Sequence, residues 1–192
     1  MLVGFDANNV FRNGEDLGEW SRGLVERLAG RHVTEFRALL FATRMKAAYK
    51  GYYTSFANVS TFVPVGTMKM LPSAWMRYRL AEWLKLERVK VFHGLNEELP
   101  YGIGGEVKTV VTCFGLENHH QTSLLDSMIW KKRMKYALQS SDVVVAVSEE
   151  LKRQLMEEGV SEQKIVVIGT DNPYEMTDTI AEQYYELYKK LC

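Results

Sequence analysis

The sequence has few cysteines and lacks both a disulfide framework and a metal-binding motif. Its 192 residues include two cysteines, Cys113 and Cys192, which are far apart and form no CxxC pair. His119 and His120 are adjacent and have no further ligand at helical spacing, so they are interpreted as surface histidines. We therefore expect no metal site, no cofactor and a reducing, cytoplasmic location.

The chain also lacks long apolar runs and an excess of either charge. No apolar run reaches the roughly 18 residues that cross a membrane, and Met1 is followed at once by a strand-like segment, which predicts no secretory signal. Lys and Arg together number 24, as do Asp and Glu, so no overall positive field favours nucleic acid as a partner. With 46% hydrophobic residues, we expect one globular domain, or one large domain with an appendage.

Short apolar runs alternate along the chain with segments of helical period. This alternation is typical of βαβ units and predicts a three-layer, Rossmann-like α/β fold with a mainly parallel sheet of about six or seven strands. Residues 45–56 are aromatic-rich and are interpreted as a short helix or a mobile loop. Strands are predicted at residues 2–5, 32–42, 59–63, 89–92, 107–113, 142–147 and 164–168, and helices at residues 17–28, 72–90, 124–140, 148–158 and 175–191.

Polar residues follow several of the predicted strands. Asp6, Asn8 and Asn9 come after the first strand, and the loop after residues 89–92 contains His, Asn and Glu. Open α/β sheets bind ligands outside the carboxyl ends of their strands. We therefore expect the ligand face at the ends of strands one, four and five.

Gly14 and Gly18 lie in a loop that enters the first long helix. Glycines let the backbone approach a ligand closely, and a helix N-terminus favours a phosphate. The pattern is neither a P-loop nor GxGxxG, because no Lys-Ser/Thr pair follows and Asp16 stands where the second Gly would be. Acidic residues around the loop count against a phosphate cradle, so an ordinary Gly turn into a helix stays an equal alternative.

The helix that begins at Pro72 carries large apolar residues at helical spacing, including Trp75, Met76 and Leu80, with basic residues opposite. The favoured interpretation is a face packed into the core. A basic, aromatic helix can also lie in a membrane interface, so contact with a membrane surface stays the alternative.

Several segments together resemble the N-terminal half of family-4 glycosyltransferases with the GT-B fold. They are LVGFDANNVFRNGEDLGEWSRGLVERLA, VFHGLNEELPYGI, TVVTCFGL, DSMIWKKRMKYALQSSDVVVAVSEELKRQLMEEG and KIVVIGTD, in family order. The resemblance covers about residues 1–171. It implies a Rossmann-like acceptor domain without the second, donor-binding domain, followed by residues 172–192 as the family's last helix packing back on the first domain.

The resemblance carries over to individual residues unevenly. His93, Asn96 and Glu97 match a family segment expected to bind the acceptor, whereas Gly14 and Gly18 match the loop that faces the donor phosphate. The family usually has T-x-H-D-L after the next strand, and here the sequence is TCFGL, at residues 112–116. Because Phe and Gly cannot replace the His-Asp pair, no catalytic residue is assigned.

The resemblance thus implies an acceptor-side glycosyltransferase domain that is not catalytically competent alone. The ligand it implies is a sugar acceptor or the phosphate of a nucleotide sugar. Two alternatives remain: the acceptor half of a split enzyme, with a donor-domain partner chain, and a stand-alone Rossmann-like scaffold, natural or engineered. The replaced His-Asp pair and the last helix favour the scaffold over the split enzyme.

Overall fold

The computed structural model describes residues 1–12, 14–95, 97–116 and 124–192. Seven strands form one sheet in the order β3-β2-β1-β4-β5-β6-β7, and every neighbouring pair is parallel. The strands are β1 (Leu2–Asp6), β2 (Arg37–Phe41), β3 (Val59–Phe62), β4 (Val91–Gly94), β5 (Lys108–Cys113), β6 (Val143–Ala146) and β7 (Ile165–Val167). The predicted fold class is confirmed.

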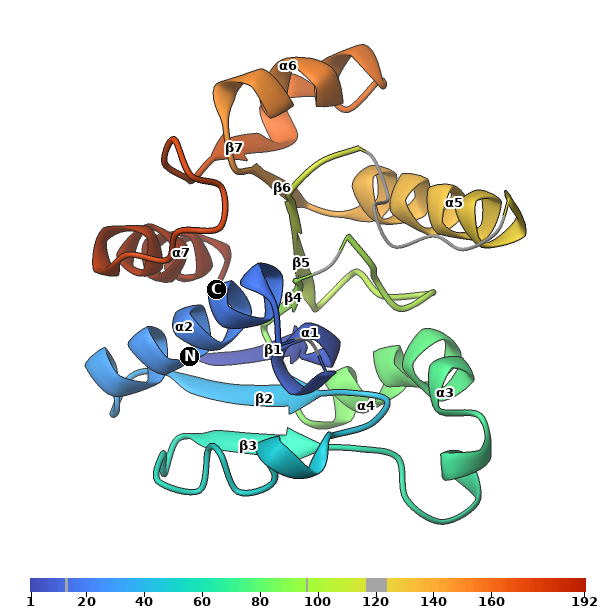
Figure 1. Ribbon diagram of the computed structural model, residues 1–192, viewed down its shortest axis with the longest axis vertical. Coiled ribbons are helices and arrows are strands. Elements are labelled where there is room, and N and C mark those ends of the chain that lie inside the picture. The colour runs from blue at the N-terminus through green and yellow to red at the C-terminus, as the bar shows by residue number, and fades with distance from the viewer. Residues whose placement is uncertain (13, 96, 117–123) are drawn as a thin grey trace.

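Helices cover both faces of the sheet (Figure 1). One core cluster joins the sheet to α1 (Asn8–Arg12), α2 (Asp16–Arg31) and α7 (Asp178–Leu191). The other joins it to α3 (Pro72–Tyr78), α4 (Leu80–Leu86), α5 (Leu124–Ser140) and α6 (Glu149–Glu157). The central strands are buried on both sides, which is why they appear in the sequence as continuous apolar runs.

The boundaries differ from the predicted ones at several points. The run 32–42 starts as a turn, in which the Phe36 amide donates to the His32 carbonyl, so β2 begins only at Arg37. The single helix predicted from Pro72 is interrupted at Arg79. In residues 45–56 the helical part is a short 3-10 turn, η1 (Ala47–Tyr49). Two further 3-10 turns are η2 (Gly66–Met70) and η3 (Glu162–Lys164).

The apolar face of α3 and α4 packs into the core as predicted. Trp75, Met76, Leu80 and Leu84 are all buried in the cluster beside β4 and β5. Across the described ranges, no helix is both long and apolar enough to cross a membrane. His119 and His120 lie outside the described residues.

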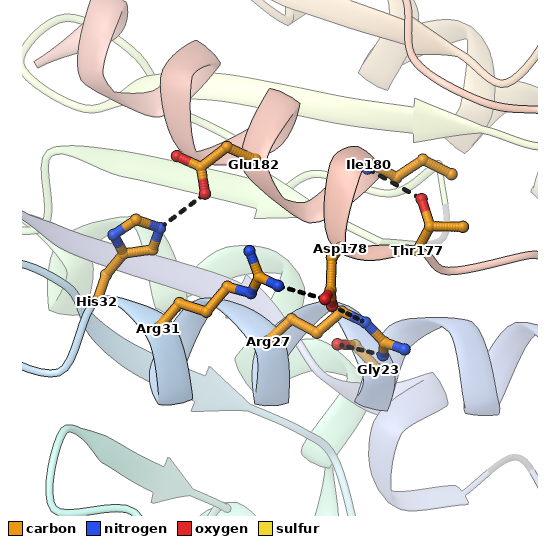
Figure 2. Close-up of polar contacts among 8 residues, drawn as sticks. All are labelled: Gly23, Arg27, Arg31, His32, Thr177, Asp178, Ile180 and Glu182. Carbon is orange, nitrogen blue, oxygen red and sulfur yellow. Dashed lines mark hydrogen bonds and ion pairs between the residues drawn. The ribbon is translucent and has the colours of Figure 1, made fainter.

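The last helix, α7, packs against α2, and polar contacts fix this pairing at its rim. Thr177 caps α7 by accepting a hydrogen bond from the Ile180 amide at 3.2 Å. Asp178 pairs with Arg31 and, at 3.0 Å, with Arg27, and the His32 ring lies 3.1 Å from Glu182 (Figure 2). These groups are partly exposed and each pair contributes little. Apolar burial beneath them supplies most of the docking energy.

Candidate functional site

A cavity of about 780 Å³ opens at the carboxyl ends of β1, β2 and β4. This is the edge at which open parallel sheets bind ligands. Most of the side chains around it are polar or charged. They belong to Asp6, Asn8, Asn9, Arg12, Gly14, Glu15, Thr43, Lys46, Ser73, Met76, Arg77, Phe92, Glu98, Leu99, Pro100 and Arg133.

A chain of hydrogen bonds joins the ends of β1 and β2 at the base of this cavity. Asp6 Oδ1 accepts from the Asn8 amide at 3.0 Å and from Asn8 Nδ2 at 2.8 Å. Asn8 Oδ1 in turn accepts from the Thr43 amide at 2.9 Å and from Thr43 Oγ1 at 2.7 Å. The orientation of all three side chains is therefore fixed before any ligand arrives.

Asp6 combines deep burial with a place in the cavity wall. Burial, with a smaller contribution from Glu98, raises its pKa to about 7, against the hydrogen bonds from Asn8 and the charge of Arg12. The carboxyl group is therefore divided between its charged and neutral forms near neutral pH. Both Asn8 bonds end on Oδ1, and no residue in the described ranges donates to Oδ2. Oδ2 therefore keeps its capacity to accept a hydrogen bond.

Four basic side chains contribute to the same cavity: Arg12, Lys46, Arg77 and Arg133. Arg133 Nη1 forms an ion pair with Glu98 Oε1 at 3.1 Å. Arg12 Nη1 donates to Thr43 Oγ1 at 3.3 Å, a contact with a neutral group. For Lys46 and Arg77, no described carboxylate lies within ion-pair distance. The basic groups thus exceed the carboxylates that neutralise them.

Of the four predicted site residues that the structure describes, Gly14, Gly18, His93 and Glu97, only Gly14 lines the cavity. Gly18 is buried within α2, and Asn96 lies outside the described residues. His93 is fully buried, with its Nδ1 at 2.7 Å from the Tyr188 hydroxyl and its Nε2 at 2.8 Å from Thr112 Oγ1. Burial lowers the His93 pKa to about 3. His93 therefore links β4 to α7 and does not line the cavity.

The Glu97 side chain is also buried in the protein. Its Oε1 accepts from the Phe114 amide at 2.9 Å, and burial raises its pKa to about 7. The residue adopts a left-handed conformation, with φ of 53°. It holds the end of β5 against the loop after β4, which is a structural contact. The acceptor-binding role of His93, Asn96 and Glu97 stays a prediction from the family resemblance.

The segment that replaces the family's His-Asp pair forms packing contacts. Phe114 lies edge-on to Trp20, with ring centroids 4.9 Å apart, and stacks on Tyr174 at 5.6 Å. Cys113 is buried, which raises its pKa. Phe114 thus fills a gap between α2 and the segment before α7. In the part of the chain that the structure describes, no group of three or more His, Cys, Asp or Glu residues could hold a metal ion.

Gly94 ends β4 at a point where the following loop folds back closely. A Cβ at this position would lie 2.2 Å from the Glu98 carbonyl oxygen, which is backbone and cannot move aside. We expect Gly94→Ala to lower the free energy of unfolding by about 1–3 kcal/mol, the usual scale for overpacking. Chemical denaturation measures this. Gly30→Ala, in α2 with open space around its Cβ, is the control and should not destabilise; equal losses in both variants would contradict the close approach.

Most of the cavity residues were not identified from the sequence. The signals in the sequence that pointed to this face are the polar cluster Asp6, Asn8 and Asn9 after the first strand, the loop after residues 89–92, and Gly14. Arg12, Thr43 with Lys46, Arg77 and Arg133 come from four separate segments, and only the fold brings them together.

A family model described as Glycosyltransferase Family 4 matches residues 22–170. No curated protein matches the chain. Anabaena Alr3699/HepE in complex with UDP and glucose has a TM-score of 0.52 at 13% identity, and the match covers 88% of this chain and 43% of that chain. For S. aureus MnaA with UDP, the TM-score is 0.56 at 14% identity, with 93% and 47% covered.

A third solved structure matches over nearly its whole length. It is described as sucrose-phosphate synthase (tll1590)_27_220_406_426 from Thermosynechococcus elongatus, with a TM-score of 0.53 at 12% identity, covering 100% of this chain and 99% of that chain. At such low identities these likenesses show the fold alone. The chain spans less than half the length of HepE and MnaA.

Proposed function

Because the chain belongs to glycosyltransferase family 4, we propose that it is the acceptor-side half of a GT-B glycosyltransferase and binds a sugar in the cavity at the carboxyl ends of β1, β2 and β4. The observation that carries this proposal is the hydrogen-bonded chain Asp6-Asn8-Thr43 at the base of that cavity. It presents fixed polar groups in a recess large enough for a small ligand.

The polar groups suit a ligand that carries several hydroxyls. Asp6 Oδ2 accepts a hydrogen bond from one hydroxyl, and the Arg12 guanidinium, whose donors exceed its single bond to Thr43, donates to another. Asn9, which also lines the cavity, has an amide nitrogen without a partner in the described structure. A sugar offers both donors and acceptors to such a set.

The second part of the proposal is that the chain performs no transfer alone. Catalysis of glycosyl transfer depends on positioning the donor and stabilising its departing phosphate. HepE was solved with UDP and glucose, and the chain covers 43% of that protein. At residues 112–116, where the family has its His-Asp pair, Phe114 provides packing and no proton transfer.

For the domain organisation, we propose that residues 1–171 form the acceptor domain and residues 172–192 its returning terminal helix. The burial of Ile180, Tyr184 and Tyr188 against the first domain supports this. The sucrose-phosphate synthase neighbour, whose description carries the two ranges 27_220 and 406_426, fits the same organisation. Because α7 completes the core cluster of the first domain, the same packing also favours the second candidate, a stand-alone scaffold that binds no ligand.

Sugar binding separates the two candidates. We expect free glucose, galactose or mannose at millimolar concentration to shift the backbone NMR signals of Asn8, Asn9, Gly14 and Thr43, and UDP-glucose to release no UDP above the buffer rate. Asp6→Asn keeps the Oδ1 contacts to Asn8 but replaces the acceptor Oδ2 by a donor, so affinity should fall about tenfold. Unchanged signals with all three sugars would favour the scaffold, and UDP release by the chain alone would contradict the lack of turnover.

A further inference from the structure

We propose that the acceptor carries an oxyanion, a phosphate or a carboxylate, and that Arg12, Lys46 and Arg77 bind it in the cavity. This inference rests on the proposed function and specifies its substrate class. The hydrogen-bonded chain Asp6-Asn8-Thr43 at the base of the cavity would bind the hydroxyls of the sugar ring. The basic residues would bind the negative group of the same molecule.

The three basic residues come from separate elements that the fold holds at one opening. Arg12 ends α1, and its guanidinium contacts Thr43 Oγ1. The Lys46 amide donates to the Phe11 carbonyl at 3.1 Å, which fixes the chain at Lys46 next to the end of α1. Arg77 lies on α3, and its carbonyl accepts from the Tyr101 amide at 2.8 Å, which ties α3 to the loop after β4.

The carboxylates around the cavity do not neutralise these three groups. Glu98 is paired with Arg133 at 3.1 Å. Asp6 is only partly ionised near neutral pH, since burial raises its pKa. Glu15 is exposed at the rim and has an interaction of its own. The cavity therefore has an excess of positive charge within a chain whose net charge is zero.

This excess of positive charge favours an anionic ligand, because guanidinium and ammonium groups bind oxyanions more strongly than they bind neutral hydroxyls. A neutral sugar would use the Asp6 end of the cavity and leave Lys46 and Arg77 without a partner. A sugar with a charged group would use both ends. Charge complementarity therefore favours the charged acceptor.

Isothermal titration of the full chain tests this with matched ligands. The ligands are glucose, galactose and mannose, their 6-phosphates, glucuronate and UDP. We expect at least one hexose 6-phosphate, or glucuronate, to bind about tenfold or more tightly than its neutral parent, and to bind more weakly as ionic strength rises. Comparing the 6-phosphates with glucuronate identifies which oxyanion the site prefers.

Two variants locate the binding. Lys46→Gln and Arg77→Gln should each weaken binding of the charged sugar about tenfold and leave binding of the neutral parent unchanged. Lys90→Gln removes the same charge just before β4, at the amino end of the sheet, and should have no effect. Circular dichroism melting checks that all three variants fold.

Three outcomes would overturn the inference. Equal affinity for neutral and charged sugars would contradict the proposal that the acceptor carries an oxyanion, and would leave the proposed function intact. Lys46-dependent binding of UDP without binding of charged sugars would assign the basic groups to a nucleotide. If no sugar bound, whether neutral or charged, both the charged acceptor and the proposed acceptor site would be contradicted.

Discussion

Replacing Tyr184 by Ala is expected to lower the free energy of unfolding by about 3–5 kcal/mol, the scale for truncating a large buried aromatic side chain. Tyr184 is fully buried, its ring lies 5.7 Å from that of Trp20, and its hydroxyl is 2.8 Å from Thr112 Oγ1. The substitution leaves a cavity between α7 and the sheet, because packed backbones on both sides prevent collapse. Equilibrium unfolding in urea measures the loss.

Two variants on the same helix make this result specific. Tyr184→Phe removes only the hydroxyl, and because Thr112 keeps its contact with His93, the expected loss is about 1 kcal/mol. Glu186→Ala is exposed on α7, where it pairs with Lys189, and should change stability by at most about 0.5 kcal/mol. If Tyr184→Ala unfolded at the same urea concentration as Glu186→Ala, α7 would not be docked as described.

Glu97→Gln is expected to stabilise the protein at alkaline pH. Burial raises the Glu97 pKa from its ordinary value of 4.5 to about 7. Because the folded pKa lies above the unfolded one, the protonated side chain contributes full stability below about pH 4.5, and this contribution is lost as pH rises through about 7. Gln has no such dependence, and its Oε1 can still accept from the Phe114 amide. The gain should be on the order of 3 kcal/mol well above pH 7.

The pH profile of the difference is the diagnostic measurement. Unfolding free energies of the two proteins should converge below about pH 4.5 and separate between about pH 5 and 8. Glu106→Gln, on an exposed loop, provides the control and should follow the unmodified protein at every pH. A constant difference between Glu97→Gln and the unmodified protein would mean that Glu97 does not titrate in the folded state as its burial requires.

The fold could be predicted from the sequence because its signals are local and mutually consistent. Doubly buried strands such as β5 and β6 appear as apolar runs, and α6 shows both a helical period and the Ser148 cap, whose hydroxyl accepts from the Leu151 amide. Boundaries were less predictable, because apolar residues such as Phe36 are buried in turns as well as in strands. The interruption at Arg79 has no local signal of its own.

The site was only partly predictable. The local sequence pattern around a polar residue does not show whether its side chain is buried in the core or lines the cavity. His93 is the second-last residue of β4, close to the expected edge, yet α7 returns across the sheet and encloses it with Tyr188. Lys46 belongs to a segment interpreted as a short helix or loop, and nothing nearby indicates a cavity. The basic residues of the helix that begins at Pro72 were placed opposite its apolar face, and this placement does not show that Arg77 faces a cavity.

The sequence by itself predicted the α/β class, the family resemblance and the carboxyl edge of the sheet, at which the cavity opens beside β1, β2 and β4. These depend on residue patterns within single segments, and the direction of parallel strands makes their carboxyl ends coincide. Only the tertiary structure decided which polar side chains meet. Asp6, Arg12, Lys46 and Arg77 converge because strand order and helix packing place distant segments at one opening, whereas the same packing buries His93 and Glu97 behind it.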